Sequence, residues 1–165
     1  MSITTRFISD LHFGHKNMAI KRGFQSELEH DIYIIKLWNS VVEPKDITWI
    51  LGDITMEKVD SYYKLNSLNG IKKVILGNHD QSQHVPELLN YVDRVAGMVD
   101  IENKIYGNFI LTHCPIHTNE LEFRYKYNIH GHVHENSLKD IRYINVCCEA
   151  INYTPKTLEQ LFKNI

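Results

Sequence analysis

Histidine and aspartate recur in short motifs along this chain, and each motif directly follows an apolar or β-branched segment. In chain order the motifs are Asp10-Leu11-His12, Gly52-Asp53, Gly77-Asn78-His79-Asp80, His113 and Gly131-His132-Val133-His134. Where a strand ends, residues i and i+2 point to the same side, so the two polar members of Asp10-x-His12 can reach one ion. Carboxylate and imidazole ligands together suit ions such as Mn²⁺, Fe²⁺, Zn²⁺ or Co²⁺. The pattern predicts a metal centre at strand ends.

Each motif taken alone is weak. An isolated Asp-x-His is most often a solvated turn, and an isolated Gly-Asp is usually a turn as well. Together the motifs favour function, because core packing does not require polar residues at the ends of so many strands. The chain contains 10 histidines, and half of them belong to these motifs.

The first three motifs need strands to position them, and the sequence predicts these strands at 3–8, 47–51 and 71–76. A helix is predicted over 26–42 and a second over 57–68. Ser26 and Glu29 fit a capping box at the start of the first helix, and Pro44 follows its end. The apolar face of this helix is predicted to comprise Leu28, Ile32, Ile35 and Val42.

The second half of the chain favours strands. The expected elements are a short helix at 85–89, strands at 94–105, 109–112 and 141–147, a turn near Gly107-Asn108, a polar and aromatic loop at 115–127, and a last helix capped by Thr154 with Pro155 at its first position. Strand–helix alternation followed by strands indicates an α/β layered domain. In such sheets, sites form at the carboxyl ends of the strands.

Composition limits the classes of function. The 165 residues, 43% of them hydrophobic, are typical of one domain, which we place at 1–165. The net charge of −2 argues against a protein whose affinity comes mainly from nucleic-acid phosphates. Residues 1–6 lack the apolar region of a secretory signal, and no stretch of about 18 apolar residues exists. Three cysteines, two of them adjacent, are typical of buried reduced thiols, so we expect a cytoplasmic protein without a membrane partner.

The ordered motifs resemble the calcineurin-like metallophosphoesterase superfamily, and the resemblance covers nearly the whole chain. The segments Tyr143-Ile144-Asn145-Val146 and Asn152-Tyr153-Thr154-Pro155 also resemble small single-domain bacterial and phage members. The resemblance implies a four-layer α/β/β/α sandwich of two mixed sheets. It also implies two divalent metal ions, with Mn²⁺ favoured and Fe, Zn, Ni or Co as alternatives.

The resemblance assigns a role to each motif residue. Asp10, His12 and His134 would hold the first metal, Asn78, His113 and His132 the second, and Asp53 would bridge them. His79 would contact the phosphoryl oxygen or protonate the leaving group, and Asp80 would orient His79 through a hydrogen bond. A hydroxide activated by both metals would attack phosphorus.

Residues beside these motifs are weaker candidates for substrate binding. His15 and Asn17 follow the first motif, and His117 follows His113. Arg124 begins a basic and aromatic cluster that ends at Tyr127 and could stack a base or hold a phosphate. For His117 and for this cluster, a surface histidine and a solvated loop with aromatic packing are the favoured interpretations.

The sequence therefore predicts a metal-dependent phosphoesterase with a phosphodiester or nucleotide substrate. Phosphodiesters are favoured over monoesters by a small margin. The alternatives are a nuclease or nucleic-acid end-processing phosphatase, which the charge does not favour, and a metal-binding scaffold without catalysis. All seven ligand candidates and the His79-Asp80 pair are present, which argues against the scaffold. The sequence does not indicate an oligomeric state.

Overall fold

Two mixed sheets form the centre of the molecule. The computed structural model describes residues 3–56 and 58–163. The first sheet has the order β4-β3-β2-β1-β9, with β1 at Thr5–Ile8, β2 at Ile47–Ile50, β3 at Ile71–Ile75, β4 at Arg94–Ala96 and β9 at Lys156–Thr157. The second sheet has the order β5-β6-β7-β8, with β5 at Val99–Asn103, β6 at Gly107–Leu111, β7 at Tyr127–His130 and β8 at Tyr143–Asn145.

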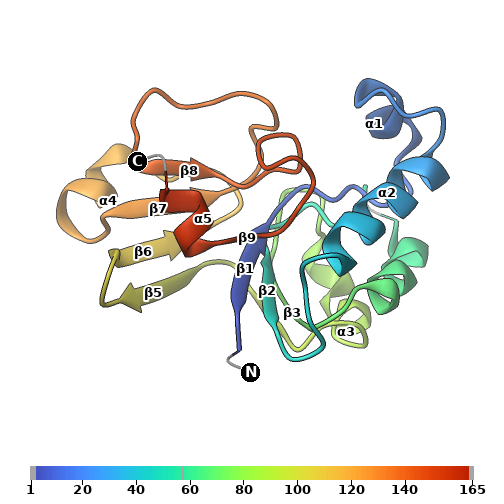
Figure 1. Cartoon of the computed structure of the whole chain (residues 1–165), viewed down its shortest axis with the longest axis horizontal. Helices are drawn as coiled ribbons and strands as arrows, with labels where there is room; N and C mark the ends of the chain where they lie inside the picture. Colours follow the sequence, from blue (N-terminus) through green and yellow to red (C-terminus); the bar gives the residue numbers. More distant parts are fainter. Residues whose placement is uncertain (1–2, 57, 164–165) are drawn as a thin grey trace.

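The pairing within each sheet gathers strand ends at one place. Strands β1 to β4 are parallel, and β9 is antiparallel to β1. In the second sheet β6, β7 and β8 are parallel and β5 is antiparallel to β6. Just beyond the end of β1, Ser9 forms an isolated parallel bridge with Cys147, so the two sheets meet where their parallel strands end. Figure 1 shows β6, β7 and β1 running towards this meeting point.

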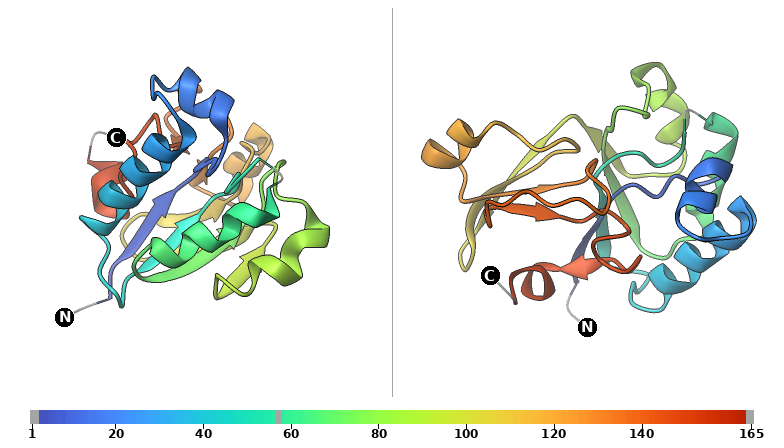
Figure 2. Two further views of the ribbon diagram at one scale, coloured as in Figure 1. Left: turned by 90° about the vertical axis from the view of Figure 1, so that its right-hand side faces the viewer. Right: turned by 90° about the horizontal axis from the view of Figure 1, so that it is seen from above.

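Helices flank the two sheets on their outer sides. They are α1 Lys16–Lys21, α2 Glu27–Asn39, η1 Val59–Ser67, η2 Ser82–His84, α3 Val85–Leu88, α4 Thr118–Phe123 and α5 Leu158–Phe162, where η marks a 3₁₀ helix. The elements α1, α2, η1 and α3 lie on the side of the first sheet, and the short α4 lies on the side of the second (Figures 1 and 2). The helix α5 packs against β9 and β1, and its Phe162 contacts Tyr106 and Tyr127 beside the second sheet. The predicted α/β fold of two mixed sheets with flanking helices is confirmed.

The core lies between the sheets and under α2. Phe7 of β1 and Phe109 of β6 meet edge to face with ring centroids 6.4 Å apart, which is a favourable geometry for aromatic pairs. Both side chains are almost fully buried. On the other side of the first sheet, the buried Trp38 of α2 donates its indole N–H to the carbonyl of Asn69 at 3.0 Å. These contacts fix the strands whose ends carry the polar motifs.

The predicted apolar face of the helix α2 is half right: Val42 is 1% exposed and Ile35 packs against the core, but Leu28 and Ile32 face solvent. Leu28 and Ile32 are 64% and 56% exposed, whereas Ile34 and Trp38 are fully buried. The buried face also carries a polar residue, Asp31, whose carboxylate accepts from Lys64 Nζ and the Gly14 backbone N–H. A pattern based on hydrophobicity included Leu28 and Ile32 because this buried carboxylate interrupts the apolar stripe. The N-cap role of Ser26 is confirmed, since its side chain accepts from the Glu29 backbone N–H at 3.1 Å.

Two predicted segments in the second half are divided in the structure. The single strand predicted over 94–105 is two strands, β4 and β5, which belong to different sheets. The chain changes sheet at Gly97, an exposed residue without a side chain that would hold it in either sheet. The loop predicted at 115–127 contains α4, whose buried Leu121 anchors it.

The remaining differences concern two other helices. The helix predicted over 57–68 is the 3₁₀ helix η1, and Glu57 lies outside the described residues. The last helix, α5, begins after Thr157 rather than Thr154. Thr157 and Gln160 form a capping box there, and this satisfies the first backbone N–H groups better than a start at Pro155 would.

Among the described residues, no helix combines the length and apolarity needed to cross a membrane.

The two faces of α2 give a stability test. We expect Trp38→Ala to lower the free energy of unfolding by about 3–5 kcal/mol, because it leaves a cavity and frees a hydrogen-bond acceptor. For the matched change Leu28→Ala, on the exposed face, we expect a free energy of unfolding within about 0.5 kcal/mol of the unmodified protein. Urea unfolding measures both. A larger loss for Leu28→Ala than for Trp38→Ala would contradict the observed orientation of the helix.

Candidate metal centre

One group of predicted ligands lies beyond β1 and β7. His12 Nε2 and His134 Nε2 lie 3.7 and 3.8 Å from Asp10 Oδ1. Asp10 and His12 are almost fully buried, and His134 is partly buried. The imidazoles of His12 and His134 are stacked, with ring centroids 5.4 Å apart. The three ligand atoms lie within 4.8 Å of one another, so one ion can contact all three.

A second group lies beyond β3, β6 and β7. Asn78 Oδ1 is 2.9 Å from both His113 Nε2 and His132 Nδ1, and these two nitrogens are 3.2 Å apart. The other ring nitrogen of His113 faces the Leu51 carbonyl at 2.8 Å, which fixes the orientation of the ring. His113 is buried, whereas Asn78 and His132 are exposed. This second group therefore faces solvent.

Asp53 lies between the two groups. Its Oδ2 atom is 3.8 Å from His12 Nε2 and 3.4 Å from His113 Nε2. Ligand atoms of Asp10, Asp53 and His113 also lie within 4.8 Å of one another. The structure thus brings all seven predicted ligands together, with one carboxylate oxygen of Asp53 facing a histidine from each group.

The backbone at this site is strained. Five of the predicted ligands have a positive φ between 49° and 72°, namely Asp10, His12, Asp53, His132 and His134. Residues other than glycine rarely adopt this left-handed backbone conformation. Each residue that does so costs the folded state on the order of 1–3 kcal/mol. Such strain persists only where the surrounding structure enforces it, and it clusters at functional sites. Here the left-handed backbone conformation turns the polar side chains of these residues towards one another.

Two glycines allow the close approach of the loops. A Cβ at Gly52 would lie 2.5 Å from His113 Nδ1 and 2.6 Å from Gly77 Cα, and Gly52 itself has φ +89°. A Cβ at Gly131 would collide with Ser9 Oγ and would lie 2.5 Å from Asp10 Oδ2. Neither position can hold a larger residue without displacing a ligand.

The protein stabilises the charged form of both acidic ligands. Burial opposes ionisation of Asp10, but the nearby imidazoles of His12 and His113 hold its pKa well below the usual range. Burial also opposes ionisation of Asp53, and its interaction with His113 lowers the pKa. Burial, together with the Arg22 charge, lowers the pKa of His12. Burial also opposes protonation of His113, but Asp53 raises its pKa, and the contact with Glu149 raises the pKa of His134. These directions favour charged Asp10 and Asp53 and a neutral His12, the forms in which these three side chains bind a metal.

The residues fit a cation. Within the described part of the chain, Asp10 Oδ1 and His12 Nε2 are buried atoms without a hydrogen-bond partner. Buried polar atoms normally have partners, and an unpaired carboxylate oxygen is costly. Both atoms point into the same group of ligands, where a divalent ion would satisfy them.

Asp80 is buried and holds the loop that carries Asp53. Its Oδ2 accepts the backbone N–H groups of Asp53 at 2.7 Å and Gly77 at 2.9 Å, and its Oδ1 accepts from Ile54 at 3.1 Å. The backbone N–H of His79 donates to Asp53 Oδ1 at 3.0 Å. Asp80 thus positions Asp53 through the backbone. The hydrogen bond that Asp80 would accept from the imidazole of His79 stays a prediction.

The profile of the calcineurin-like phosphoesterase family matches residues 3–164. The chain belongs to this family. Members of the family depend on metals, and the His and Asp clusters described above are the candidate ligands in this chain.

Relatives of similar length support this assignment. An uncharacterized protein of Methanocaldococcus jannaschii is 34% identical over 170 residues, which cover 96% of this chain and 89% of the relative. The gene 66 protein of Mycobacterium phage D29 is 31% identical over 81% of this chain and 79% of its own length. The gene 66 protein of Mycobacterium phage L5 is 33% identical over 79% of this chain and 77% of its own length.

Solved structures share the fold. A protein of unknown function from Aquifex aeolicus has a TM-score of 0.78 and 28% identity, and the match covers 99% of this chain and 100% of that protein. An archaeal phosphodiesterase has a TM-score of 0.51 and 20% identity, with 87% and 82% covered. At this identity the second likeness concerns the fold alone.

Sequence reasoning missed several side chains that hold the ligands of this family member. Asp10 Oδ2 accepts from Ser9 Oγ at 2.5 Å and from Cys147 Sγ at 3.1 Å. Glu149 Oε1 lies 3.0 Å from His134 Nδ1 and accepts from Arg22 Nε at 2.8 Å. The adjacency of Ser9 and Asp10 was visible in the sequence. The contacts of Cys147 with Asp10 and of Glu149 with Arg22 join residues more than 100 positions apart, and the contact of Glu149 with His134 spans 15 positions, so none of them forms a local motif.

The predicted substrate residues are only partly near the site. His15 lies beside His12, with ring centroids 5.8 Å apart, and Asn17 is exposed on α1. His117 is exposed and caps α4, where its Nδ1 accepts from the Asn119 backbone N–H.

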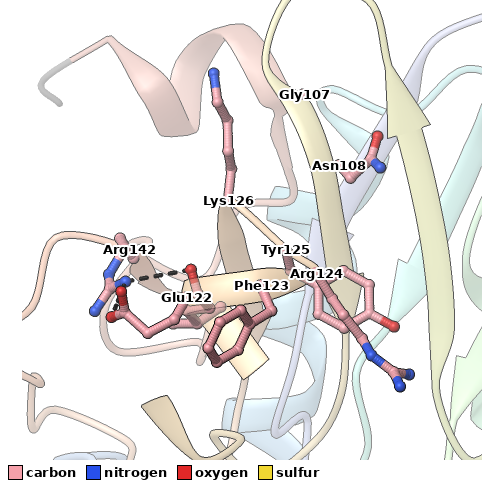
Figure 3. Close-up of a pocket in the computed structure, with 9 residues that line it drawn as sticks. Gly107, Asn108, Glu122, Phe123, Arg124, Tyr125, Lys126 and Arg142 are labelled. Atoms are coloured by element: carbon pink, nitrogen blue, oxygen red, sulfur yellow. Dashed lines mark hydrogen bonds and ion pairs between the residues drawn. The ribbon is translucent and has the colours of Figure 1, made fainter. Parts of the chain in front are cut away.

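Arg124 is not placed with the predicted ligands. It lies before β7, whereas His132 and His134 follow the other end of that strand. It lines a separate pocket of about 400 Å³ together with Tyr125 and Arg142 (Figure 3). The sequence missed this separation because the chain runs back along the second sheet after His113.

The contact at Gly131 gives a test of the geometry. We expect Gly131→Ala to weaken metal binding by about 10–100-fold, the range seen when groups that orient ligands are disturbed, because the new Cβ displaces Asp10. Gly97→Ala is the matched control, since a Cβ at Gly97 would meet nothing within 4 Å. Titration of the metal-free protein with Mn²⁺ measures both. Equal affinities would contradict the close approach of Gly131 to Asp10.

Proposed function

We propose that this protein is a phosphodiesterase that uses two divalent metal ions, with Mn²⁺ favoured. The observation that carries the proposal is the position of Asp53, whose Oδ2 faces His12 on one side and His113 on the other. A carboxylate oxygen between two imidazoles from different ligand groups fits a bridge between two ions. One ion alone would leave one of these groups without a role.

The two groups would each hold one ion. Asp10, His12 and His134 would bind the first, and Asn78, His113 and His132 the second, with Asp53 shared. When bound, the two ions would lower the pKa of a water molecule and stabilise negative charge on the phosphoryl oxygens.

The protein's own residues prepare the site for this reaction. Ser9 and Cys147 both donate to Asp10 Oδ2, which leaves Oδ1 directed at His12 and His134. Asp53 Oδ1 accepts from the His79 backbone N–H, which leaves Oδ2 directed at the ligand groups. Fixed orientation of this kind removes the cost of arranging charged groups during the reaction.

His79 is the proposed donor to the leaving group. Its ring lies 5.9 Å from that of His12, so it borders the first ligand group. The half-buried imidazole would give its proton to the oxygen that leaves phosphorus as the ester bond breaks. The departing alcohol would then leave as a neutral molecule.

The exposed side of the site favours small phosphodiesters or nucleotides. Asn78, His132 and Cys114 are exposed, so substrate can approach over the second ligand group. The net charge of −2 provides no general attraction for nucleic acid.

The proposal predicts metal-dependent hydrolysis that requires Asp53. We expect the Mn²⁺-loaded protein to release nitrophenol from bis(p-nitrophenyl) phosphate and Asp53→Asn to be inactive, because an amide cannot bridge two ions as a carboxylate does. A panel of cyclic nucleotides, dinucleotides, nucleic-acid ends and phosphomonoesters then ranks the substrates. Activity that survives in Asp53→Asn would contradict the mechanism, and a preference for monoesters would contradict the diesterase assignment.

A second prediction concerns His79. We expect His79→Ala to lower turnover by about 10²–10⁴-fold while bound metal stays unchanged, because the residue acts on the leaving group. His84→Ala, which removes an imidazole from η2, is the control and should retain turnover. Steady-state kinetics and metal analysis of the same preparations test this. Loss of metal in parallel with activity would instead make His79 a ligand.

A further inference from the structure

A buried arginine lies directly behind the first ligand group. The side chain of Arg22, which follows α1, is 1% exposed. Its Nη2 donates to the Asp10 carbonyl at 2.8 Å, and its Nη1 donates to the Leu11 carbonyl at 3.4 Å. Nη1 also lies 2.8 Å from His30 Nε2. One guanidinium therefore holds the backbone of the first metal motif, where Asp10 adopts its strained conformation.

Glu149 connects this arginine to a ligand on the opposite side of the site. Glu149 Oε1 accepts from Arg22 Nε at 2.8 Å and lies 3.0 Å from His134 Nδ1. The other ring nitrogen of His134 faces Asp10 Oδ1 at 3.8 Å. The four residues form a closed ring of contacts from Asp10 to Arg22, Glu149, His134 and back to Asp10.

The ring has a clear physical consequence. A carboxylate on one imidazole nitrogen fixes which nitrogen carries the proton and which way the ring points. A buried guanidinium also needs a counter-charge, and Glu149 is the carboxylate that contacts it. Arg22 and Glu149 therefore hold each other in place, and each holds one part of the first ligand group.

The second ligand group is oriented in another way. His113 Nδ1 faces the backbone carbonyl of Leu51, and His132 Nδ1 faces Asn78, itself a predicted ligand. Neither contact involves Arg22 or Glu149. Loss of the Glu149 carboxylate should therefore disturb the two groups unequally.

We propose that Arg22 and Glu149 are positioning residues that set the affinity of the first metal site without affecting the second. This inference rests on the proposed two-metal function and deepens it. It makes occupancy of the two sites separable: the second ion can remain bound when the first is lost.

The test compares Glu149→Gln with Glu122→Gln. Both changes replace a carboxylate that pairs with an arginine by a near-isosteric amide, but Glu122 pairs with Arg142 at 2.7 Å beside the separate pocket of Figure 3. Equilibrium dialysis with Mn²⁺ gives the number and affinity of bound ions. Electron paramagnetic resonance distinguishes a coupled Mn²⁺ pair from isolated Mn²⁺.

We expect the wild-type protein and Glu122→Gln to bind two ions that give the spectrum of a coupled pair. Glu149→Gln should bind one ion with unchanged affinity and the other about 10–100-fold more weakly, so isolated Mn²⁺ appears and the pair returns at higher Mn²⁺ concentration. Arg22→Lys, which keeps the positive charge but offers fewer directed donors, should show the same selective loss to a smaller extent.

Two outcomes would overturn the inference. Two ions bound by Glu149→Gln with wild-type affinity would show that Glu149 has no role in metal binding. Equal weakening of both sites, together with a lower melting temperature of the metal-free protein, would show a purely structural role. Absence of hydrolysis by a wild-type protein that binds two ions would contradict the proposed function alone.

Discussion

Two carboxylates buried close together are the constraint on which this structure depends. Asp10 and Asp53 are 0% and 2% exposed, and their ligand atoms lie within 4.8 Å of each other. The pKa of each carboxyl is lowered, which favours two negative charges that repel each other at the point where the two sheets meet. Backbone N–H groups, Ser9 and Cys147 offset part of this cost. A cation between the carboxylates would remove most of it, which is why a metal site explains the arrangement better than packing does.

The parallel pairing of β1 and β2 creates this closeness. Ile8 lies opposite Ile50, so the two strands end side by side. Neighbouring strands are about 4.8 Å apart, which sets the separation of the side chains that follow them. Gly52 then adds a residue with φ +89° and delays Asp53 by one position relative to Asp10. The backbone N–H of Asp10 donates to the Gly52 carbonyl at 3.0 Å, so each loop supports the strained backbone of the other.

The sequence was sufficient to predict what depends on strand ends. The seven ligand candidates follow strands, and strands of a parallel sheet deliver their ends to one edge whatever the details of packing. Prediction from the sequence failed where the position of a side chain depends on tertiary contacts. The buried face of α2 carries Asp31, which hydrophobicity alone would assign to solvent. The basic and aromatic cluster around Arg124 suggested that Arg124 binds substrate. In the fold it lies at the end of β7 opposite to the ligands.

Arg22 and Glu149 show most clearly why such contacts leave no trace in a single sequence. They are separated by 127 positions, and neither lies in a motif. Their importance comes from where the fold buries them, because a guanidinium that is 1% exposed must be neutralised nearby.

The consequence is an asymmetric site. Asp10 and His12 of the first ligand group are buried, and charged side chains lie behind that group. Asn78 and His132 face solvent, and their side chains contact each other and His113. Charged side chains hold the first ligand group rigidly, whereas the second ligand group is open to solvent. This arrangement suits a reaction in which the protein fixes the first group and the substrate approaches the second. Under the proposed function, substrate choice would then depend on the residues around the exposed half. Cys114 is one of them, with its sulfur within 4.8 Å of imidazole nitrogens of His113 and His132.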